Sequence, residues 1–202
     1  MINVSTIKIP YEKLLARLGY LKAKTKLDAK TEILIKENLA LAQKLISPKA
    51  VIAFSKIHIT EDIISLSGKF KITGKDIAKL LDGCFKAYGI AVTIGKALEQ
   101  KRNFFIENKE TFNALVLDSA GSVAAEEAIT LANSQIKDFE TSAGNALTKR
   151  YSPGYGDWQL SSQKDFLNWL GAQKIGISLT QHYLMTPEKS VSAIIGVKTY
   201  LS

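Results

Sequence analysis

The apolar residues of this chain follow two different spacings, and segments with the two spacings do not alternate regularly. Residues 62–72 place Ile64, Ile72 and the apolar residues between them on alternate positions, as a strand with one buried face requires. Residues 11–19 carry apolar side chains at helical spacing and end on Gly19. This mixture without a strict β-α-β order predicts an α+β fold, with a mixed, largely antiparallel sheet flanked by helices.

The same patterns predict the other elements. Further strands are expected over residues 50–60 and 87–95, and further helices over 29–46 (capped by Asp28), 75–84, 96–108 and 161–171. Near the C-terminus, two short strands are expected on either side of a turn at Thr186-Pro187.

The segment from residue 113 to residue 139 is predicted to be a strand followed by a helix. Ala114–Leu117 form the strand, Asp118–Ser122 form a turn, and a long helix begins near Ser122. No composition shift marks a linker, so residues 1–202 are expected to form one domain. A separate subdomain over residues 1–90 is the alternative.

Composition excludes several classes of protein. The 27 basic and 19 acidic residues give a net charge of +8, but the lysines are scattered and the aromatics are not interleaved with them. We therefore expect a solvated surface and no nucleic-acid binding. Neither a secretory signal nor an apolar run of ~18 residues is found, so we expect a cytoplasmic protein that does not bind a membrane.

The reactive side chains point to neither a metal site nor a catalytic group. The single cysteine, Cys84, excludes an internal disulfide, and its apolar neighbours favour a buried thiol over a nucleophile. His58 and His182 lie far apart and lack companion ligands at metal spacing. No metal ligand and no catalytic residue is therefore predicted.

The stretch KRYSPGYGDWQL, residues 149–160, combines features that a simple linker does not need. Arg150 offers a rigid fork of donors that matches a carboxylate, Gly154 lets the backbone approach a ligand closely, and Tyr155 presents a ring. These residue types suit a small-molecule site. The alternative is a surface turn in which Arg150 forms an ion pair and Tyr155 packs in the core.

Two motifs together resemble one known family. Arg150, Gly154 and Tyr155 fit the R-x-x-x-G-Y signature of the activation domain of cobalamin-dependent methionine synthase. Downstream, the chain is similar to that family's segment of form G-(I/M)-x-L-T-(E)-x-x-x-M-x-P-x-x-S-V-S-G. The matching residues are Gly176, Leu179, Thr180, Met185, Pro187, Ser190, Val191 and Ser192.

The resemblance implies a ligand and a set of residues that bind it. The family's activation domain binds S-adenosylmethionine. By analogy, Arg150 would bind the methionyl carboxylate, Ser152 and Gly154 would contribute backbone contacts, and Tyr155 would contact the ligand and face the corrin. The family also uses a glutamate on the preceding helix, for which Glu126 is the best match and Glu127 the second.

The resemblance also implies partners. The chain resembles the activation module as a stand-alone accessory subunit, acting on cobalamin carried by the cobalamin-binding core of methionine synthase. Electrons would come from an external donor such as flavodoxin or ferredoxin. Two alternatives stay open: a reactivating protein for another corrinoid methyltransferase, and a module that docks a corrinoid protein without binding S-adenosylmethionine.

Overall fold

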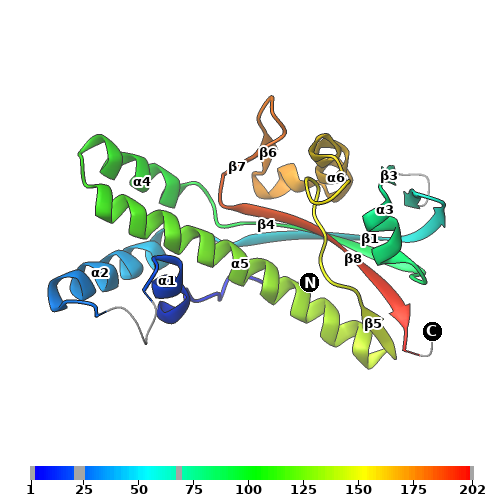
Figure 1. Ribbon diagram of the computed structural model, residues 1–202, viewed down its shortest axis with the longest axis horizontal. Coiled ribbons are helices and arrows are strands. Elements are labelled where there is room, and N and C mark those ends of the chain that lie inside the picture. Colours follow the sequence, from blue (N-terminus) through cyan, green and yellow to red (C-terminus); the bar gives the residue numbers. More distant parts are fainter. Residues whose placement is uncertain (1–2, 21–25, 67–69, 201–202) are drawn as a thin grey trace.

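The computed structural model describes residues 3–20, 26–66 and 70–200 and shows one central sheet with helices on both faces (Figure 1). The described α-helices are α1 (Tyr11–Arg17), α2 (Ala29–Leu45), α3 (Lys75–Leu81), α4 (Ala97–Glu107), α5 (Thr111–Ser142) and α6 (Gln163–Leu170). The described strands are β1 (Lys49–Thr60), β2 (Ile63–Leu66), β3 (Lys71–Thr73), β4 (Lys86–Thr93), β5 (Asn145–Leu147), β6 (Ser178–Leu179), β7 (Met185–Thr186) and β8 (Ser190–Thr199). Short 3₁₀ helices η1 (Leu160–Ser162) and η2 (Ala172–Ile175) flank α6.

The main sheet has the strand order β3-β2-β1-β4-β8-β5, and each of its described pairings is antiparallel. The strands β1, β4 and β8 form its centre; Ala91 of β4, for example, lies between Val51 and Ser192. The separate hairpin β6–β7 stands above the sheet (Figure 1). This arrangement confirms the predicted α+β class and its largely antiparallel sheet.

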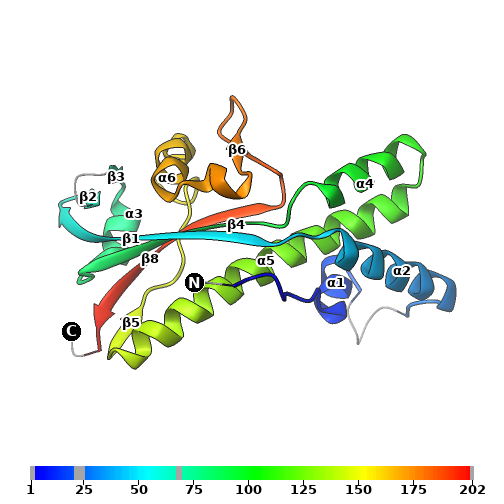
Figure 2. The same cartoon turned by 180° about the vertical axis from the view of Figure 1, so that it is seen from behind.

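Helices cover both faces of the sheet (Figure 2), and a separate hydrophobic core lies between each face and its helices. Alternate residues of β4 serve each core: Ile90 and Val92 face α5, whereas Ala87 and Ala91 face α3 and α6. Because β4 is buried on both faces, its sequence is apolar without interruption. This explains why residues 87–95 could be recognised as a strand from composition alone.

The structure contradicts the predicted strand and turn at residues 114–122. Both segments lie inside α5, which runs unbroken for 32 residues. A four-residue apolar run is buried equally well in a strand or in a helix between neighbouring helices, so periodicity could not separate the two. Ser122, the expected helix cap, donates instead to the carbonyl of Asp118 within the same helix.

Two smaller differences concern turns. The predicted strand at 62–72 is two strands, β2 and β3, which pair as a hairpin whose residues 67–69 lie outside the described part. The turn at Thr186-Pro187 does not separate two short strands, because β6 and β7 are joined through residues 180–184 and Pro187 leads into the long strand β8. The short edge strand β5 was not predicted.

Two predicted helix boundaries are confirmed. Asp28 caps α2 by accepting a hydrogen bond from the backbone N–H of Thr31, and Gly171 ends α6 in the left-handed region. Within the described ranges, no helix is long and apolar enough to cross a bilayer.

A buried polar cluster fixes the end of α5 to the sheet. The side chain of Glu140 is 1% exposed and accepts hydrogen bonds from Lys86 Nζ at 2.6 Å, Asn145 Nδ2 at 2.8 Å and the Tyr88 hydroxyl. Burial acts to raise the pKa of Glu140, but these hydrogen bonds outweigh burial and lower the pKa below its ordinary value. The carboxylate therefore stays charged when the protein folds.

Replacing Glu140 tests the contribution of this cluster. We expect Glu140→Gln to lower the free energy of unfolding at pH 7 by about 2 kcal/mol, since Lys86 keeps a largely buried charge without a counter-charge. Because the folded pKa is lowered, the contribution exists above the unfolded pKa and disappears as pH falls through the folded pKa. Urea unfolding between pH 7 and pH 3 should therefore show a shallower acid decline in the variant than in the wild type.

The exposed carboxylate of Asp138 on the same helix provides the control. Asp138→Asn should change the free energy of unfolding by less than about 0.5 kcal/mol and leave the pH profile unaltered. Equal losses in the two variants would show that the Glu140 cluster contributes nothing specific.

Candidate functional site

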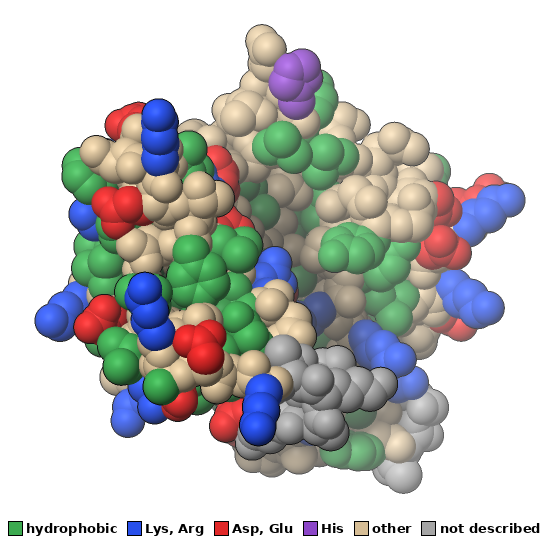
Figure 3. All heavy atoms as spheres, turned by 60° about the vertical axis from the view of Figure 1, so that its left-hand side comes forward, with side chains coloured by type: hydrophobic (Ala, Val, Ile, Leu, Met, Phe, Trp, Pro, Cys, Tyr) green, Lys and Arg blue, Asp and Glu red, His purple; other side chains and the backbone are tan. Residues whose placement is uncertain are grey.

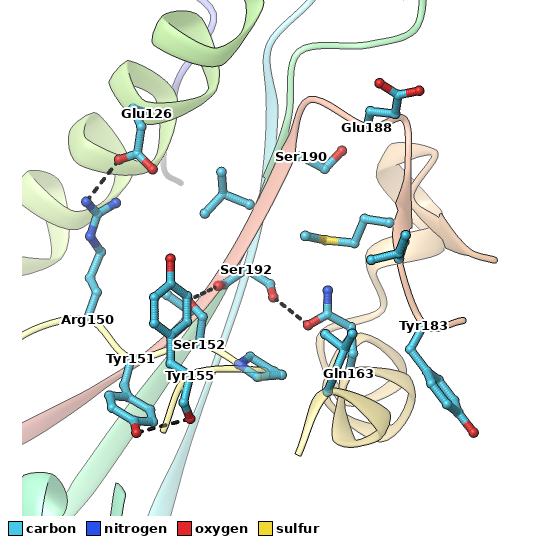
Figure 4. A pocket seen from close by; sticks show the side chains of 16 residues that line it. Glu126, Arg150, Tyr151, Ser152, Tyr155, Gln163, Tyr183, Glu188, Ser190 and Ser192 are labelled. Carbon is cyan, nitrogen blue, oxygen red and sulfur yellow. Dashed lines mark hydrogen bonds and ion pairs between the residues drawn. The ribbon is translucent and has the colours of Figure 1, made fainter. Parts of the chain in front are cut away.

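A cavity of about 660 Å³ lies where α5, the loop after β5, the start of β8 and the β6–β7 hairpin meet. Figure 3 shows the hollowed surface, and Figure 4 shows the side chains around the cavity. The lining residues are Glu126, Arg150, Tyr151, Ser152, Pro153, Tyr155, Leu160, Gln163, Tyr183, Leu184, Met185, Glu188, Ser190, Val191, Ser192 and Ala193. Four of the five predicted site residues, Glu126, Arg150, Ser152 and Tyr155, are among them.

The loop that carries these residues is attached to β8. Tyr151 and Ile194 exchange two backbone hydrogen bonds, at 3.0 and 2.8 Å, and the Ser152 hydroxyl donates to the Ser192 carbonyl at 2.6 Å. Loops without such bonds are the mobile parts of most folds. This loop is instead hydrogen-bonded to the central strand β8, which fixes the positions of its side chains at the cavity.

Gly154 shapes the loop and is absent from the cavity lining. Its φ is +93°, and its N–H donates to the Trp158 carbonyl at 2.7 Å. The Trp158 N–H in turn donates to the Tyr155 carbonyl at 3.1 Å, which closes a tight turn. A left-handed residue at this point favours glycine, so Gly154 turns the chain and directs Tyr155 toward the cavity.

Arg150 and Glu126 face one another across one end of the cavity (Figure 4). Arg150 Nη2 and Glu126 Oε2 are 3.3 Å apart, and the two side chains are 31% and 57% exposed. The structure also separates the two candidate glutamates, because Glu127 pairs with Lys13 and is absent from the cavity lining. An exposed pair with one long contact is weak, so a stronger partner can replace either side chain in it.

Tyrosine side chains form part of the opposite rims of the opening. Tyr155 is 67% exposed, which contradicts the alternative that it packs in the core. Tyr183 and Leu184 at the tip of the β6–β7 hairpin are 39% and 57% exposed and also line the cavity. Exposed aromatic and aliphatic side chains beside a cavity suit contact with a flat apolar partner.

The three residues after Tyr155 attach the loop to α3 and to the hydrophobic core. Gly156 has a φ of +51°, Asp157 accepts from the backbone N–H groups of Lys75 and Asp76 at the start of α3, and Trp158 is 1% exposed. The Trp158 ring stacks on Tyr151 with centroids 6.4 Å apart. The segment Gly156–Trp158 therefore anchors the loop to α3 and to the core.

Sequence reasoning assigned no site role to most of the other lining residues, among them Gln163, Tyr183 and Glu188. Gln163 begins α6, Tyr183 lies at the hairpin tip, and Glu188 precedes β8. None of them stands close in sequence to the R-x-x-x-G-Y motif, and only the tertiary fold brings them to it. Tyr183 and Glu188 lie inside the downstream segment that carried the resemblance, at positions that its pattern leaves variable, and this was the signal that the sequence offered for them.

A charged network fixes Glu188 and the turn before β8. The Arg102 guanidinium contacts Glu188 at 2.7 Å and Asp118 at 2.9 Å, and Lys189 contacts Asp118 at 2.8 Å. The hydrogen bond from Arg102 lowers the pKa of Glu188. Burial acts to raise the pKa of Asp118, but hydrogen bonds from Lys189 and Arg102 outweigh it and lower the pKa. Both carboxylates therefore hold the cavity wall as anions.

Cys84 is a free cysteine whose side chain is partly buried. Burial raises the pKa of the Cys84 thiol, which keeps it protonated and agrees with a structural role. Among the described residues, no group of three or more His, Cys, Asp and Glu side chains is placed to hold a metal ion.

Comparison with known proteins gives a consistent result. The family model described as "Vitamin B12 dependent methionine synthase, activation domain" matches residues 75–200. A crystal structure of the MetH reactivation domain bound to AdoHcy is similar in fold, with a TM-score of 0.66 and 12% sequence identity; the match covers 94% of this chain and 76% of that one. A search of curated protein sequences gave no match.

Gly156 allows a test of how tightly the loop is held. A Cβ at Gly156 would collide with the Tyr151 hydroxyl and the Asp76 carboxylate, and the positive φ adds strain. We expect Gly156→Ala to lower the free energy of unfolding by about 2–3 kcal/mol. Gly176→Ala is the control, since Gly176 also has a positive φ (+84°) but its Cβ would meet open space. Denaturant unfolding should show a loss of only about 1 kcal/mol for the control.

Proposed function

Because the chain belongs to the vitamin B12 dependent methionine synthase activation-domain family, we propose that its cavity binds S-adenosylmethionine for the reductive methylation of cobalamin on a partner protein. The observation that carries this proposal is the position of Arg150 and Glu126 at one end of a cavity of about 660 Å³. In this role the chain is an accessory, cytoplasmic subunit that acts on a separate cobalamin-binding protein.

The Arg150–Glu126 pair suits an α-amino acid. Such a ligand carries a carboxylate and an ammonium on the same carbon, and these groups match a guanidinium and a carboxylate that already face one another. Binding would exchange one long contact of 3.3 Å for two charge-assisted contacts to the ligand. The exchange costs little, because the original pair is largely exposed to water.

The loop supplies the other contacts. Ser152 would offer backbone groups to the ligand, whereas Gly154 lies outside the cavity lining and contributes by turning the chain. Tyr155 lies at the rim, where it would contact the ligand and the corrin above it. The AdoHcy bound to the similar crystal structure has the carbon and sulfur skeleton of S-adenosylmethionine without the transferred methyl group. This likeness supports an adenosyl ligand in the proposed role.

The contribution of this chain to the reaction is positioning. It would hold the sulfonium so that its methyl group faces the cobalt of the partner's reduced cobalamin, which supplies the nucleophile. The sulfur–methyl bond breaks as the methyl group is transferred, and S-adenosylhomocysteine leaves with the bonding electron pair. We propose that one electron comes from an external donor such as flavodoxin or ferredoxin.

Calorimetric titration with S-adenosylmethionine tests the binding site. The wild type should bind, and Arg150→Ala should weaken binding about 10- to 100-fold because a charge-assisted pair of hydrogen bonds is lost. Glu126→Gln should weaken binding less, about three- to tenfold, since this side chain is more exposed. Lys149→Ala and Glu127→Gln are the matched controls, because each changes a neighbouring residue of the same charge. The affinity of both variants for S-adenosylmethionine should stay within about twofold of the wild type.

The two outcomes lead to different conclusions. Binding that Arg150→Ala weakens and Lys149→Ala does not would support the proposal. Wild-type protein that binds no S-adenosylmethionine, alone or with a cobalamin-carrying partner present, would favour the alternative of a docking module that lacks the ligand.

Methyl transfer to a partner tests the second half of the proposal. The protein, S-adenosylmethionine, a reductant and the separate cobalamin-binding core of methionine synthase should form S-adenosylhomocysteine while the absorbance of cob(II)alamin falls. Tyr155→Ala should slow this transfer about tenfold at saturating S-adenosylmethionine, because the ring helps to align the two reactants. Tyr200→Ala, a similarly exposed tyrosine after β8, should not slow it.

The choice of partner protein separates the two corrinoid alternatives. Transfer to the methionine synthase core supports the main proposal. Transfer that occurs only with another corrinoid methyltransferase would make the chain a reactivating protein for that system.

A further inference from the structure

Gln163 presents an unused hydrogen-bond donor to the cavity. Its side chain is only 4% exposed, yet it lines the cavity. Its Oε1 accepts from the Ser192 hydroxyl at 3.3 Å, and Figure 4 shows its amide nitrogen turned into the open space. Within the described part of the chain, no protein group accepts a hydrogen bond from this nitrogen. A donor that faces a cavity and has no protein acceptor is available to a bound molecule, so we expect its acceptor on a ligand.

The neighbouring serines cannot supply this donor. The Ser152 hydroxyl donates to the Ser192 carbonyl, the Ser192 hydroxyl donates to Gln163, and the Ser190 hydroxyl donates to the Pro187 carbonyl. Each of these three hydroxyl protons is therefore used inside the protein. The three hydroxyls can only accept from a ligand, whereas the Gln163 amide can donate to one.

The surroundings of Gln163 suit a flat apolar ring that carries acceptors. Gln163 and Arg150 lie at opposite ends of the cavity (Figure 4). The apolar side chains of Pro153, Leu160 and Met185 also line the cavity, and Leu160 belongs to η1, which directly precedes Gln163 at the start of α6. An adenine ring combines apolar faces with ring nitrogens that accept hydrogen bonds. In S-adenosylmethionine, the adenine and the amino-acid carboxylate lie at opposite ends of the molecule.

We propose that Gln163 Nε2 donates a hydrogen bond to a ring nitrogen of the adenine and thereby selects an adenosyl ligand. This inference rests on the proposed function and adds a residue to it. Ser192 acts as a positioning residue, because its hydroxyl holds the Gln163 oxygen and turns the nitrogen toward the ligand.

Ligand and protein are changed together to test this contact. Calorimetry compares S-adenosylhomocysteine with its 1-deaza, 3-deaza and 7-deaza analogues, each of which lacks one ring nitrogen of the adenine. The wild type should bind one of these analogues about tenfold more weakly, because the buried amide then lacks its acceptor. Gln163→Met should bind S-adenosylhomocysteine about tenfold more weakly and should show no further loss with that same analogue.

Two further variants control for structural damage. Gln163→Glu keeps the shape and the oxygen that Ser192 contacts but replaces the donor by an acceptor, so it should weaken binding at least as much as Gln163→Met. Ser192→Ala keeps the amide donor and should weaken the binding of S-adenosylhomocysteine only about two- to threefold. Thermal unfolding of each variant shows whether the fold is retained.

The outcomes separate this inference from the proposed function. Gln163 variants that bind S-adenosylhomocysteine as tightly as the wild type would overturn the role of Gln163. The role would also be overturned if the sensitive analogue lowered the affinity of Gln163→Met by the same factor as it lowers the affinity of the wild type. Binding would still depend on Arg150 in that case. A wild type that binds none of these ligands would overturn the proposed function, and this inference with it.

Discussion

The attachment of the R-x-x-x-G-Y loop to β8 is the constraint on which the rest of the site depends. Two backbone hydrogen bonds between Tyr151 and Ile194, and one from Ser152 to Ser192, join the loop to a strand that lies between β4 and β5. The residues on either side of this attachment then have little freedom. Arg150 is placed opposite α5, and the turn at Gly154 places Tyr155 at the rim. A loop of the same sequence without this attachment would present the same groups in many arrangements, and its ligand would have to pay the entropy of ordering them.

The single long helix α5 forms ion pairs with several separate parts of the chain and so fixes their relative positions. Three of its carboxylates contact cations from different parts of the chain: Asp118 contacts Arg102 and Lys189, Glu126 contacts Arg150, and Glu140 contacts Lys86. A break after residue 117 would have separated the first contact from the other two. Because the helix is continuous, it holds the wall that carries Glu188, the cavity-lining Arg150 and the far end of the sheet in fixed relative positions.

The sequence predicted an element correctly where its residue pattern is compatible with only one type of secondary structure. Alternation predicted strand structure over residues 62–72, although the fold divides this segment into β2 and β3. An uninterrupted apolar run predicted β4, and Asp28 marked the start of α2. The segment 114–122 failed because four apolar residues followed by small ones satisfy a strand and turn as well as a buried helix. The site followed a similar rule. Arg150 and Tyr155 lie close together in the R-x-x-x-G-Y motif, and the resemblance to the family added Ser152 between them. Gln163 and Tyr183 reach the cavity only through the packing of α6 and the β6–β7 hairpin.

The two ion pairs of Glu126 and Glu140 show how one helix can hold charges with different purposes. Glu140 is buried and accepts from three donors, so exchanging its partner for a ligand would expose an unsatisfied charge at high cost. Glu126 is more than half exposed and has one contact at 3.3 Å, so water already competes for it. A charge pair that is easily opened cannot add much stability, yet it keeps a guanidinium and a carboxylate facing one another before a ligand arrives. The weakness of the Arg150–Glu126 contact is therefore what makes this end of the cavity suitable for a zwitterionic ligand.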